Sequence, residues 1–289
     1  MKKRWFTLIL VLSIATVCQV HFEYTVHFEE TGTKAAEEAQ SAEVEFESWQ
    51  EVDRFFKTVG YDLEKGIVPR VFLKSLPSNM SEIPEVGKKK ELFIKILLPI
   101  ILEVNEEIEK ERQEITTLSD NSQKLLHYMK KYRANSKEEL LEKVQPIPVE
   151  IAIAQAAIES AWGTSRFAIE GNNIFGEWTF TPGSGIVPRE RPDGEMYEVR
   201  AFDSLLDSVR SYAYNLNVSS FYSEFRKIRS GKLHKPIEEG LLYYSERRYE
   251  YVNEVKIIIS KNNLKSYSTL GLSSVRIALI KNHNLTDNY

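Results

Sequence analysis

The feature that most constrains the fold is a run of almost uniformly apolar and small residues at positions 149–162, VEIAIAQAAIESAW, followed by Gly163. Pro146 and Pro148 precede this run, and proline suits the start of a helix. A helix that is apolar on nearly every face must bury most of its surface. The run therefore predicts a central helix around which other parts of the chain pack.

Two polar side chains lie on one face inside this apolar helix. Gln155 and Glu159 lie four residues apart, so they project from the same face. An ionised glutamate in such a setting is costly unless it is paired or faces a wet cleft. Two interpretations stay open. Glu159 pairs with a neighbouring arginine such as Arg166, or it lies at the floor of a groove, where desolvation raises its pKa and keeps it protonated as a general acid.

Helical patterns also occur on both sides of this run. Apolar residues recur at three- and four-residue spacing in four earlier segments, residues 49–59, 91–118, 125–132 and 137–144. We interpret residues 48–145 as a helical scaffold and expect Pro99 to kink or break its longest helix. Further along, Ser204 is placed to cap an amphipathic helix that begins at residue 205.

Residues 177–200 have a different character. Glycine, proline and aromatic residues interrupt short β-prone runs, and Pro192-Asp193-Gly194 is a turn signal. The segment therefore predicts an irregular β-hairpin between helices. A hairpin acid that faces Glu159 across a cleft would bring two carboxyl groups together, the arrangement used in glycoside hydrolysis.

The two ends of the chain lack the helical periodicity of the middle. Residues 1–22 start with MKKR and continue with an apolar run, which is typical of an export signal. An uncleaved membrane anchor and lipidation at Cys18 are the alternatives. Residues 23–47 are strongly acidic, and we expect a disordered, solvated tether there. Residues 271–289 are interpreted as a C-terminal tail.

Several classes of function are disfavoured. The five histidines and the single cysteine show no spacing typical of a zinc site, and no glycine-rich phosphate loop occurs. Ser160 lacks the G-x-S-x-G setting of a serine hydrolase. The formal net charge of −4 argues against nucleic acid as the main partner. We therefore expect no metal, no cofactor and no nucleic acid, and we expect a monomer.

Two runs considered together carry a family resemblance. AAIESAWGTSRF, followed by GNNIFG, resembles the glucosaminidase domain of peptidoglycan-cleaving autolysins. The further runs VPR, RPDGE, VRAFDSLLDSV, YAYNLN and YSERRYEYV are similar to its Bax-like branch. The similarity extends over residues 55–265. It implies a mainly α fold, with a lysozyme-like helical catalytic domain that carries a small β-hairpin at residues 146–270, preceded by the helical scaffold.

The resemblance also implies roles for acidic residues. By position, Glu159 corresponds to the family's catalytic acid. The second acidic group lies in the hairpin, and its spacing to Gly194 favours Glu190. Glu195 and Glu198 remain alternatives, because a slip of one residue changes the face of a strand.

Sugar-binding residues follow from the same comparison. Asn173 and Phe175 match the corner that lines the groove in such domains. Trp178 is an aromatic candidate for stacking on a sugar ring. A tyrosine before the last helix is expected near the sugar, either Tyr249 or Tyr251. The family pattern has glycine just before this tyrosine pair, where this sequence has arginine at position 248.

The resulting hypothesis is an exported glycoside hydrolase of the periplasm or cell envelope. It would cleave the β-1,4 bond after N-acetylglucosamine in peptidoglycan strands, as an endo-β-N-acetylglucosaminidase. One alternative is a catalytically silent protein that binds peptidoglycan in envelope assembly. Another is an endo-β-N-acetylglucosaminidase that acts on the chitobiose cores of N-glycans.

Overall fold

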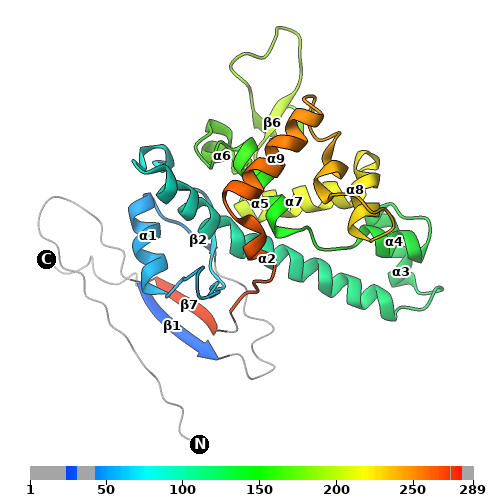
Figure 1. Cartoon of the computed structure of the whole chain (residues 1–289), viewed down its shortest axis with the longest axis horizontal. Helices are drawn as coiled ribbons and strands as arrows, with labels where there is room; N and C mark the ends of the chain where they lie inside the picture. Colours follow the sequence, from blue (N-terminus) through cyan, green and yellow to red (C-terminus); the bar gives the residue numbers. More distant parts are fainter. Residues whose placement is uncertain (1–23, 31–42, 274, 282–289) are drawn as a thin grey trace, which may run out of the picture.

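The computed structural model describes residues 24–30, 43–273 and 275–281, and it is mainly helical with a small β-hairpin (Figure 1). The expected fold class is therefore confirmed. The predicted signal or anchor at residues 1–22 lies outside the described residues. Among the helices that the structure describes, none combines the length and apolar character needed to span a membrane.

The helices surround two central elements, the long helix α2 (Val86–Thr117) and the shorter, buried helix α5 (Val149–Glu159). The others are α1 (Trp49–Thr58), α3 (Gln123–Tyr132), α4 (Lys137–Lys143), α6 (Arg166–Gly171), α7 (Leu205–Val218), α8 (Ser223–Arg229) and α9 (Tyr249–Lys261). Short 3₁₀ turns occur at η2 (Met80–Glu82), η3 (Ser220–Tyr222), η4 (Ile237–Leu241) and η5 (Leu264–Tyr267).

Helix α2 continues through Pro99 without a break, and it starts at Val86, five residues before the predicted start. The predicted break was therefore wrong. Proline removes one backbone hydrogen bond from a helix. Leu98 and Ile100, on either side of it, are fully buried, so side-chain packing holds the helix together at this point.

The scaffold and the segment after residue 146 share one hydrophobic core. Helix α5 packs against α2 and α9, and α2 also packs against α7. Buried residues of this core run from Val44 to Leu264. The boundary predicted at residue 146 stays a prediction, but the two blocks stabilise each other by burying apolar surface together.

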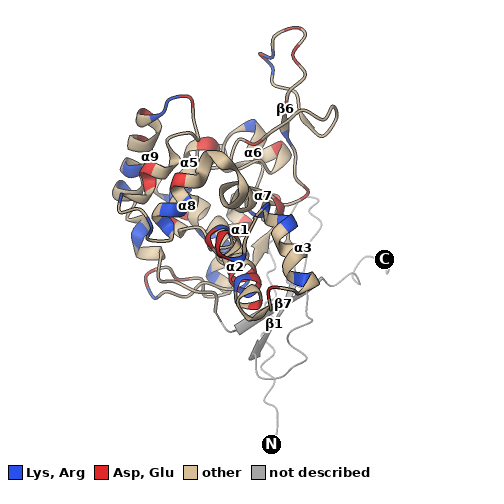
Figure 2. Cartoon of the chain, turned by 90° about the vertical axis from the view of Figure 1, so that its right-hand side faces the viewer, with Lys and Arg blue, Asp and Glu red and all other residues tan. Residues whose placement is uncertain are grey.

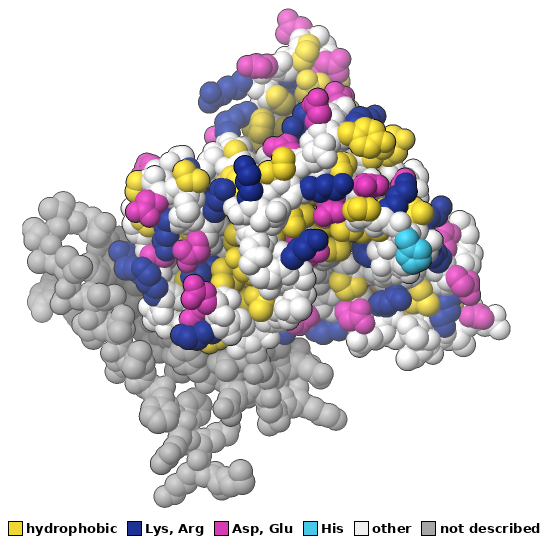
Figure 3. Space-filling view, viewed as in Figure 1, with side chains coloured by type: hydrophobic (Ala, Val, Ile, Leu, Met, Phe, Trp, Pro, Cys, Tyr) yellow, Lys and Arg dark blue, Asp and Glu magenta, His cyan; other side chains and the backbone are white. Residues whose placement is uncertain are grey.

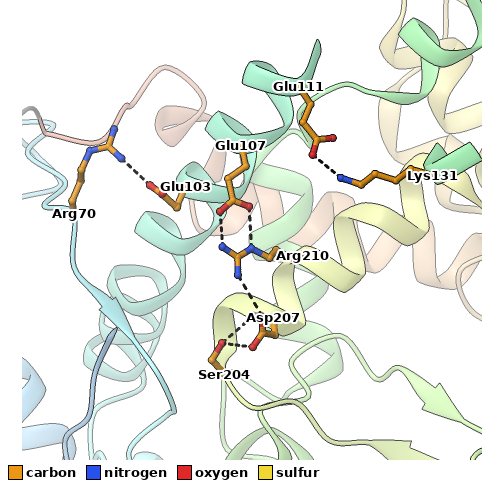
Figure 4. Close-up of polar contacts among 8 residues, drawn as sticks. All are labelled: Arg70, Glu103, Glu107, Glu111, Lys131, Ser204, Asp207 and Arg210. Carbon is orange, nitrogen blue, oxygen red and sulfur yellow. Dashed lines mark hydrogen bonds and ion pairs between the residues drawn. The ribbon is translucent and has the colours of Figure 1, made fainter. Parts of the chain in front are cut away.

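A polar row along α2 adds to this association. Three glutamates spaced four residues apart bind cations from other elements (Figure 4). The pairs are Glu103 with Arg70 (2.7 Å), Glu107 with Arg210 (2.9 and 2.5 Å) and Glu111 with Lys131 (2.5 Å). The Arg210 pair is bidentate, a geometry that is stronger and more specific than a single contact. It joins α2 directly to α7, whose first turn is capped by Ser204 as expected.

The hairpin is a three-stranded antiparallel sheet with the order β4 (Trp178–Thr179), β6 (Glu198–Arg200) and β5 (Gly185–Ile186). The predicted turn is present, since Glu195 N–H donates to Pro192 O (3.2 Å). This turn lies within a long loop between β5 and β6, and that loop projects away from the helices (Figures 1 and 2).

Part of the predicted tether and tail forms a strand pair. β1 (Tyr24–Glu30) runs antiparallel to β7 (Val275–Lys281), with Glu29 opposite Arg276. Disorder was expected only for residues 23–47, and for residues 24–30 that expectation was wrong. Strand β1 alternates apolar and polar residues from Tyr24 to Glu29, and each strand supplies hydrogen bonds that the other lacks. A second pair, β2 (Glu43–Val44) beside β3 (Phe72–Leu73), places residue 44 in the core.

A backbone irregularity just before α9 yields a stability prediction. Arg248 has φ 50° and ψ −115°, in the region that favours glycine, at the position where the family pattern has glycine. We expect Arg248→Gly to raise the free energy of unfolding by about 1 kcal/mol, because it relieves this strain. Chemical denaturation measures the change.

The matched control is Arg248→Ala. It removes the guanidinium from the ring of Tyr243, as glycine does, but it keeps the Cβ atom and hence the strain. A glycine variant that is no more stable than the alanine variant would contradict the prediction.

Candidate active site

The carboxyl group of Glu159 stands at the end of a buried helix. Helix α5 ends at Glu159, three residues before the predicted end, because Ala161, Trp162 and Gly163 all have positive φ. The Ser160 hydroxyl fixes this exit by donating to Ala156 O (2.6 Å) and accepting from Gly163 N–H (2.9 Å). Glycine is required at 163, since a Cβ atom there would lie 2.8 Å from a ring carbon of Phe93.

A chain of hydrogen bonds leads from the core to Glu159. The Tyr212 hydroxyl donates to Gln155 Oε1 (2.7 Å), and Gln155 Nε2 donates to the Tyr251 oxygen (3.0 Å). Tyr251 in turn donates to the Glu159 carboxyl. The side chains of Gln155, Tyr212 and Tyr251 are all buried. Because every link has a defined donor and acceptor, the Tyr251 proton is directed at Glu159.

Burial raises the pKa of Glu159 above its usual value. The hydrogen bond from Tyr251 and the charge of Arg247 oppose this shift only in part, and Glu254 reinforces it. Arg247 is itself paired with Glu254 (2.7 Å). The interpretation that pairs Glu159 with Arg166 is wrong, because Arg166 forms an ion pair with Glu170 (3.5 Å) and donates to a loop carbonyl. The site therefore favours a protonated Glu159.

Glu159 lines an open cavity of about 560 Å³. One wall comes from residues 175–178 at the root of the hairpin, and another from the C-terminal half of α7 and η3. Residues 244–245 contribute a third wall. Arg133 and Arg200 are the cationic residues of the cavity lining. A cavity of this size lies within the range of small-ligand sites.

Stacked aromatic rings form the base of this cavity. Phe175 stacks on Tyr212 (centroids 3.7 Å apart, planes at 4°), and Tyr244 stacks on Tyr251 (5.4 Å, 9°). The Tyr244 hydroxyl donates to Phe175 O (3.0 Å), which joins the two stacks. Phe175 is almost fully buried, so it lines the cavity as a rigid support.

Exposed apolar side chains gather on the projecting hairpin, among charged ones (Figure 3). Trp178 is 56% exposed, packs on Tyr197 (4.4 Å) and lines the cavity. Phe180 and Met196 are also exposed. Trp178 is thus the predicted aromatic residue whose face remains open to a ligand.

Asn173 is buried, and its amide bonds to backbone atoms. Its Nδ2 donates to Glu177 O and Arg200 O (both 2.7 Å), and its Oδ1 accepts from Glu177 N–H (2.9 Å). These bonds fasten the corner after α6 to the hairpin. The structure therefore places Asn173 as a brace behind the cavity.

The hairpin acids do not line the cavity. Glu190 and Glu195 are exposed in the loop between β5 and β6. Glu198 is buried, and its two oxygens accept from Gly183 N–H (3.0 Å) and Gly185 N–H (2.9 Å), which holds the β4–β5 turn. Of the tyrosine pair, Tyr251 reaches Glu159, whereas Tyr249 is 70% exposed and lies outside the cavity lining.

Sequence reasoning missed one acidic group of the cavity, Glu177. Burial raises its pKa, while the Ser211 hydroxyl and the charge of Arg200 act in the opposite direction. Its position directly after the NNIFG run was the available signal, but the search for a second acid began further along the hairpin. Among the residues whose placement is described, no group of three or more His, Cys, Asp or Glu side chains could hold a metal ion.

A family model and one relative support the resemblance, and one solved structure was also matched. A family model described as "Glucosaminidase: Mannosyl-glycoprotein endo-beta-N-acetylglucosaminidase" matches residues 134–264. Protein bax of Escherichia coli (strain K12) is 30% identical over 214 residues, covering 69% of this chain and 70% of that protein. The catalytic domain of the autolysin Auto from Listeria monocytogenes aligns with a TM-score of 0.40 and 20% identity, over 65% of this chain and 92% of that one.

The hydrogen-bond chain predicts how the pKa of Glu159 responds to mutation. The Tyr251 hydroxyl stabilises the ionised carboxyl, so we expect Tyr251→Phe to raise the pKa of Glu159 further. Titration of the ¹³C carboxyl resonance of Glu159 by NMR measures the shift. Tyr243→Phe, which alters an exposed tyrosine, is the control. An unchanged or lower pKa in Tyr251→Phe would contradict the assignment of donor and acceptor.

Proposed function

The chain belongs to the Bax-like branch of the glucosaminidase family, and we propose that it is an endo-β-N-acetylglucosaminidase acting on peptidoglycan. It would cleave the β-1,4 bond after N-acetylglucosamine in the glycan strands. The observation that carries the proposal is a half-buried carboxyl group with a raised pKa, aligned by a tyrosine, on an open cavity.

In this proposal Glu159 is the general acid. It donates its proton to the glycosidic oxygen as the bond to the anomeric carbon breaks. A raised pKa suits this role, because an acid works best when its pKa lies near the operating pH. Tyr251 positions the carboxyl and stabilises the negative charge that it acquires.

The cavity also has features suited to sugar rings. Trp178 offers an exposed aromatic face at the root of the hairpin, and Tyr214 and Tyr222 line the opposite wall. Aromatic faces pack against the apolar faces of sugar rings, and hydroxyl groups bond to their edges. We propose that these residues hold the glycan strand along the cavity.

Peptidoglycan lies outside the cytoplasm, so the proposal includes export to the periplasm or cell envelope. The basic start and apolar run of residues 1–22 support it. A cleaved signal, lipidation at Cys18 and an uncleaved anchor are compatible with this location, and N-terminal sequencing of the mature protein distinguishes them.

Glu159→Gln tests the catalytic assignment. We expect it to lower the rate of hydrolysis of purified peptidoglycan by about two to four orders of magnitude, because the neutral amide cannot donate the proton. The release of reducing ends measures the rate. Glu103→Gln, another carboxyl whose pKa burial raises, lies on α2 outside the cavity and is the matched control. Equal rates in Glu159→Gln and the parent would contradict the mechanism.

The substrate is tested by the products. Mass spectrometry of digested peptidoglycan should find N-acetylglucosamine at the new reducing ends. The matching family model is named after an enzyme that acts on mannosyl-glycoproteins, which favours N-glycan chitobiose cores as the second candidate. Release of N-glycans from glycoproteins, with intact peptidoglycan, would support that candidate. Retention on insoluble peptidoglycan with no cleavage would identify a binding protein.

A further inference from the structure

We propose that Glu177, in place of the hairpin acid Glu190, is the second carboxyl group of the reaction and activates the attacking water. The inference rests on the proposed glycosidase activity and names a further residue for it. Glu177 and Glu159 line the same cavity. The backbone next to Glu177 also lies close to Glu159, since a Cβ atom on the preceding residue, Gly176, would lie 3.2 Å from Glu159 Oε2.

The backbone of Glu177 is held at both of its polar groups. Its N–H donates to Asn173 Oδ1 (2.9 Å), and its C=O accepts from Asn173 Nδ2 (2.7 Å) and Arg200 N–H (2.9 Å). A catalytic group must be held within a fraction of an ångström of its working position. The Asn173 brace provides this precision for Glu177, and the long loop that carries Glu190 has no comparable support.

The two oxygens of the Glu177 carboxyl differ. Oε2 accepts from the Ser211 hydroxyl (2.8 Å) and lies 3.6 Å from Arg200 Nη1. Oε1 is buried and has no hydrogen-bond partner in the part of the chain that the structure describes. A buried acceptor without a donor costs about 1–3 kcal/mol, and it calls for a functional explanation. Of the two oxygens, Oε1 is therefore the one whose lone pairs no donor of the described residues occupies.

The surroundings separate the roles of the two acids. Glu177 has a cation and a hydroxyl donor of its own, which favour its ionised form. Glu159 has Tyr251, but the nearest cation, Arg247, is already paired with Glu254. Burial and the charges of Glu177 and Glu159 raise the pKa of Tyr222 to about 12. The hydroxyl of Tyr222 is therefore close enough to both carboxyl groups to interact with their charges. An acid and a base are distinguished by such differences in environment.

The step balances as a hydrolysis. Glu159 gives its proton to the leaving oxygen, and the bond from that oxygen to the anomeric carbon breaks. Water forms a bond to the same carbon and loses a proton to Glu177. One water molecule is consumed, and transfer of the proton from Glu177 to Glu159 through solvent restores both groups.

Azide rescue tests the proposal. We expect Glu177→Ala to lower peptidoglycan hydrolysis on the order of 100-fold or more, and sodium azide to restore turnover with a glycosyl azide as product. Azide attacks the anomeric carbon without the help of a base, so it can replace the water that Glu177 would activate. If Glu177 had only a structural role, azide would not restore turnover. Glu190→Ala should lose less activity than Glu177→Ala and form no glycosyl azide.

Three outcomes would overturn the proposal. They are full activity in Glu177→Ala, loss without azide rescue, or rescue in Glu190→Ala. Glu177→Gln keeps the partner of Ser211 and separates lost folding from lost catalysis, with thermal unfolding as the measure. A parent protein that releases no reducing ends would instead reject the proposed function, so the two failures are distinguishable.

Discussion

The structure depends on satisfying a few polar groups inside an almost wholly apolar helix. Helix α5 carries Gln155 into the core, where an amide without partners would be costly. Tyr212 donates to the amide oxygen of Gln155, and Tyr251 accepts from its amide nitrogen. The hydroxyl proton of Tyr251 is then directed at Glu159. The same contacts that make the burial of Gln155 tolerable therefore also align the carboxyl group of Glu159 at the cavity.

The rest of the fold positions the residues of this series of hydrogen bonds. Helix α7 supplies Tyr212, and the ion pair between Arg210 and Glu107 joins α7 to the long helix α2. Helix α9 supplies Tyr251, whose ring stacks on Tyr244. The scaffold before residue 146 thus contributes to the geometry of a site that lies after it.

Local patterns in the sequence predicted most of the helices and the position of Glu159 at the end of a buried helix. The periodicity gave α3, α4 and α7 closely, and an acid within an apolar run identified Glu159. Contacts between distant segments were not predictable in the same way. Pro99 lies inside α2 because packing outweighs one lost hydrogen bond, and β1 pairs with a strand about 250 residues away.

The same distinction applies to the site. Tyr249 and Tyr251 are equivalent by spacing, and only the packing of α9 turns one of them to Glu159. Asn173 looked like a ligand of the sugar, yet its amide is used by the backbone around Glu177. Glu177 was missed because its burial and its hydrogen bond with Ser211, which lies on α7, arise from tertiary packing.

The central claim is that the fold raises the pKa of Glu159 above that of an ordinary glutamate. Isotope-edited infrared difference spectroscopy of the parent protein against Glu159→Gln, recorded across a pH titration, follows the protonation of this carboxyl directly. We expect the carbonyl band of the protonated acid, which the variant lacks, to persist to a higher pH than it does for an ordinary glutamate. An acid band that disappears at or below the usual glutamate pKa would contradict the claim.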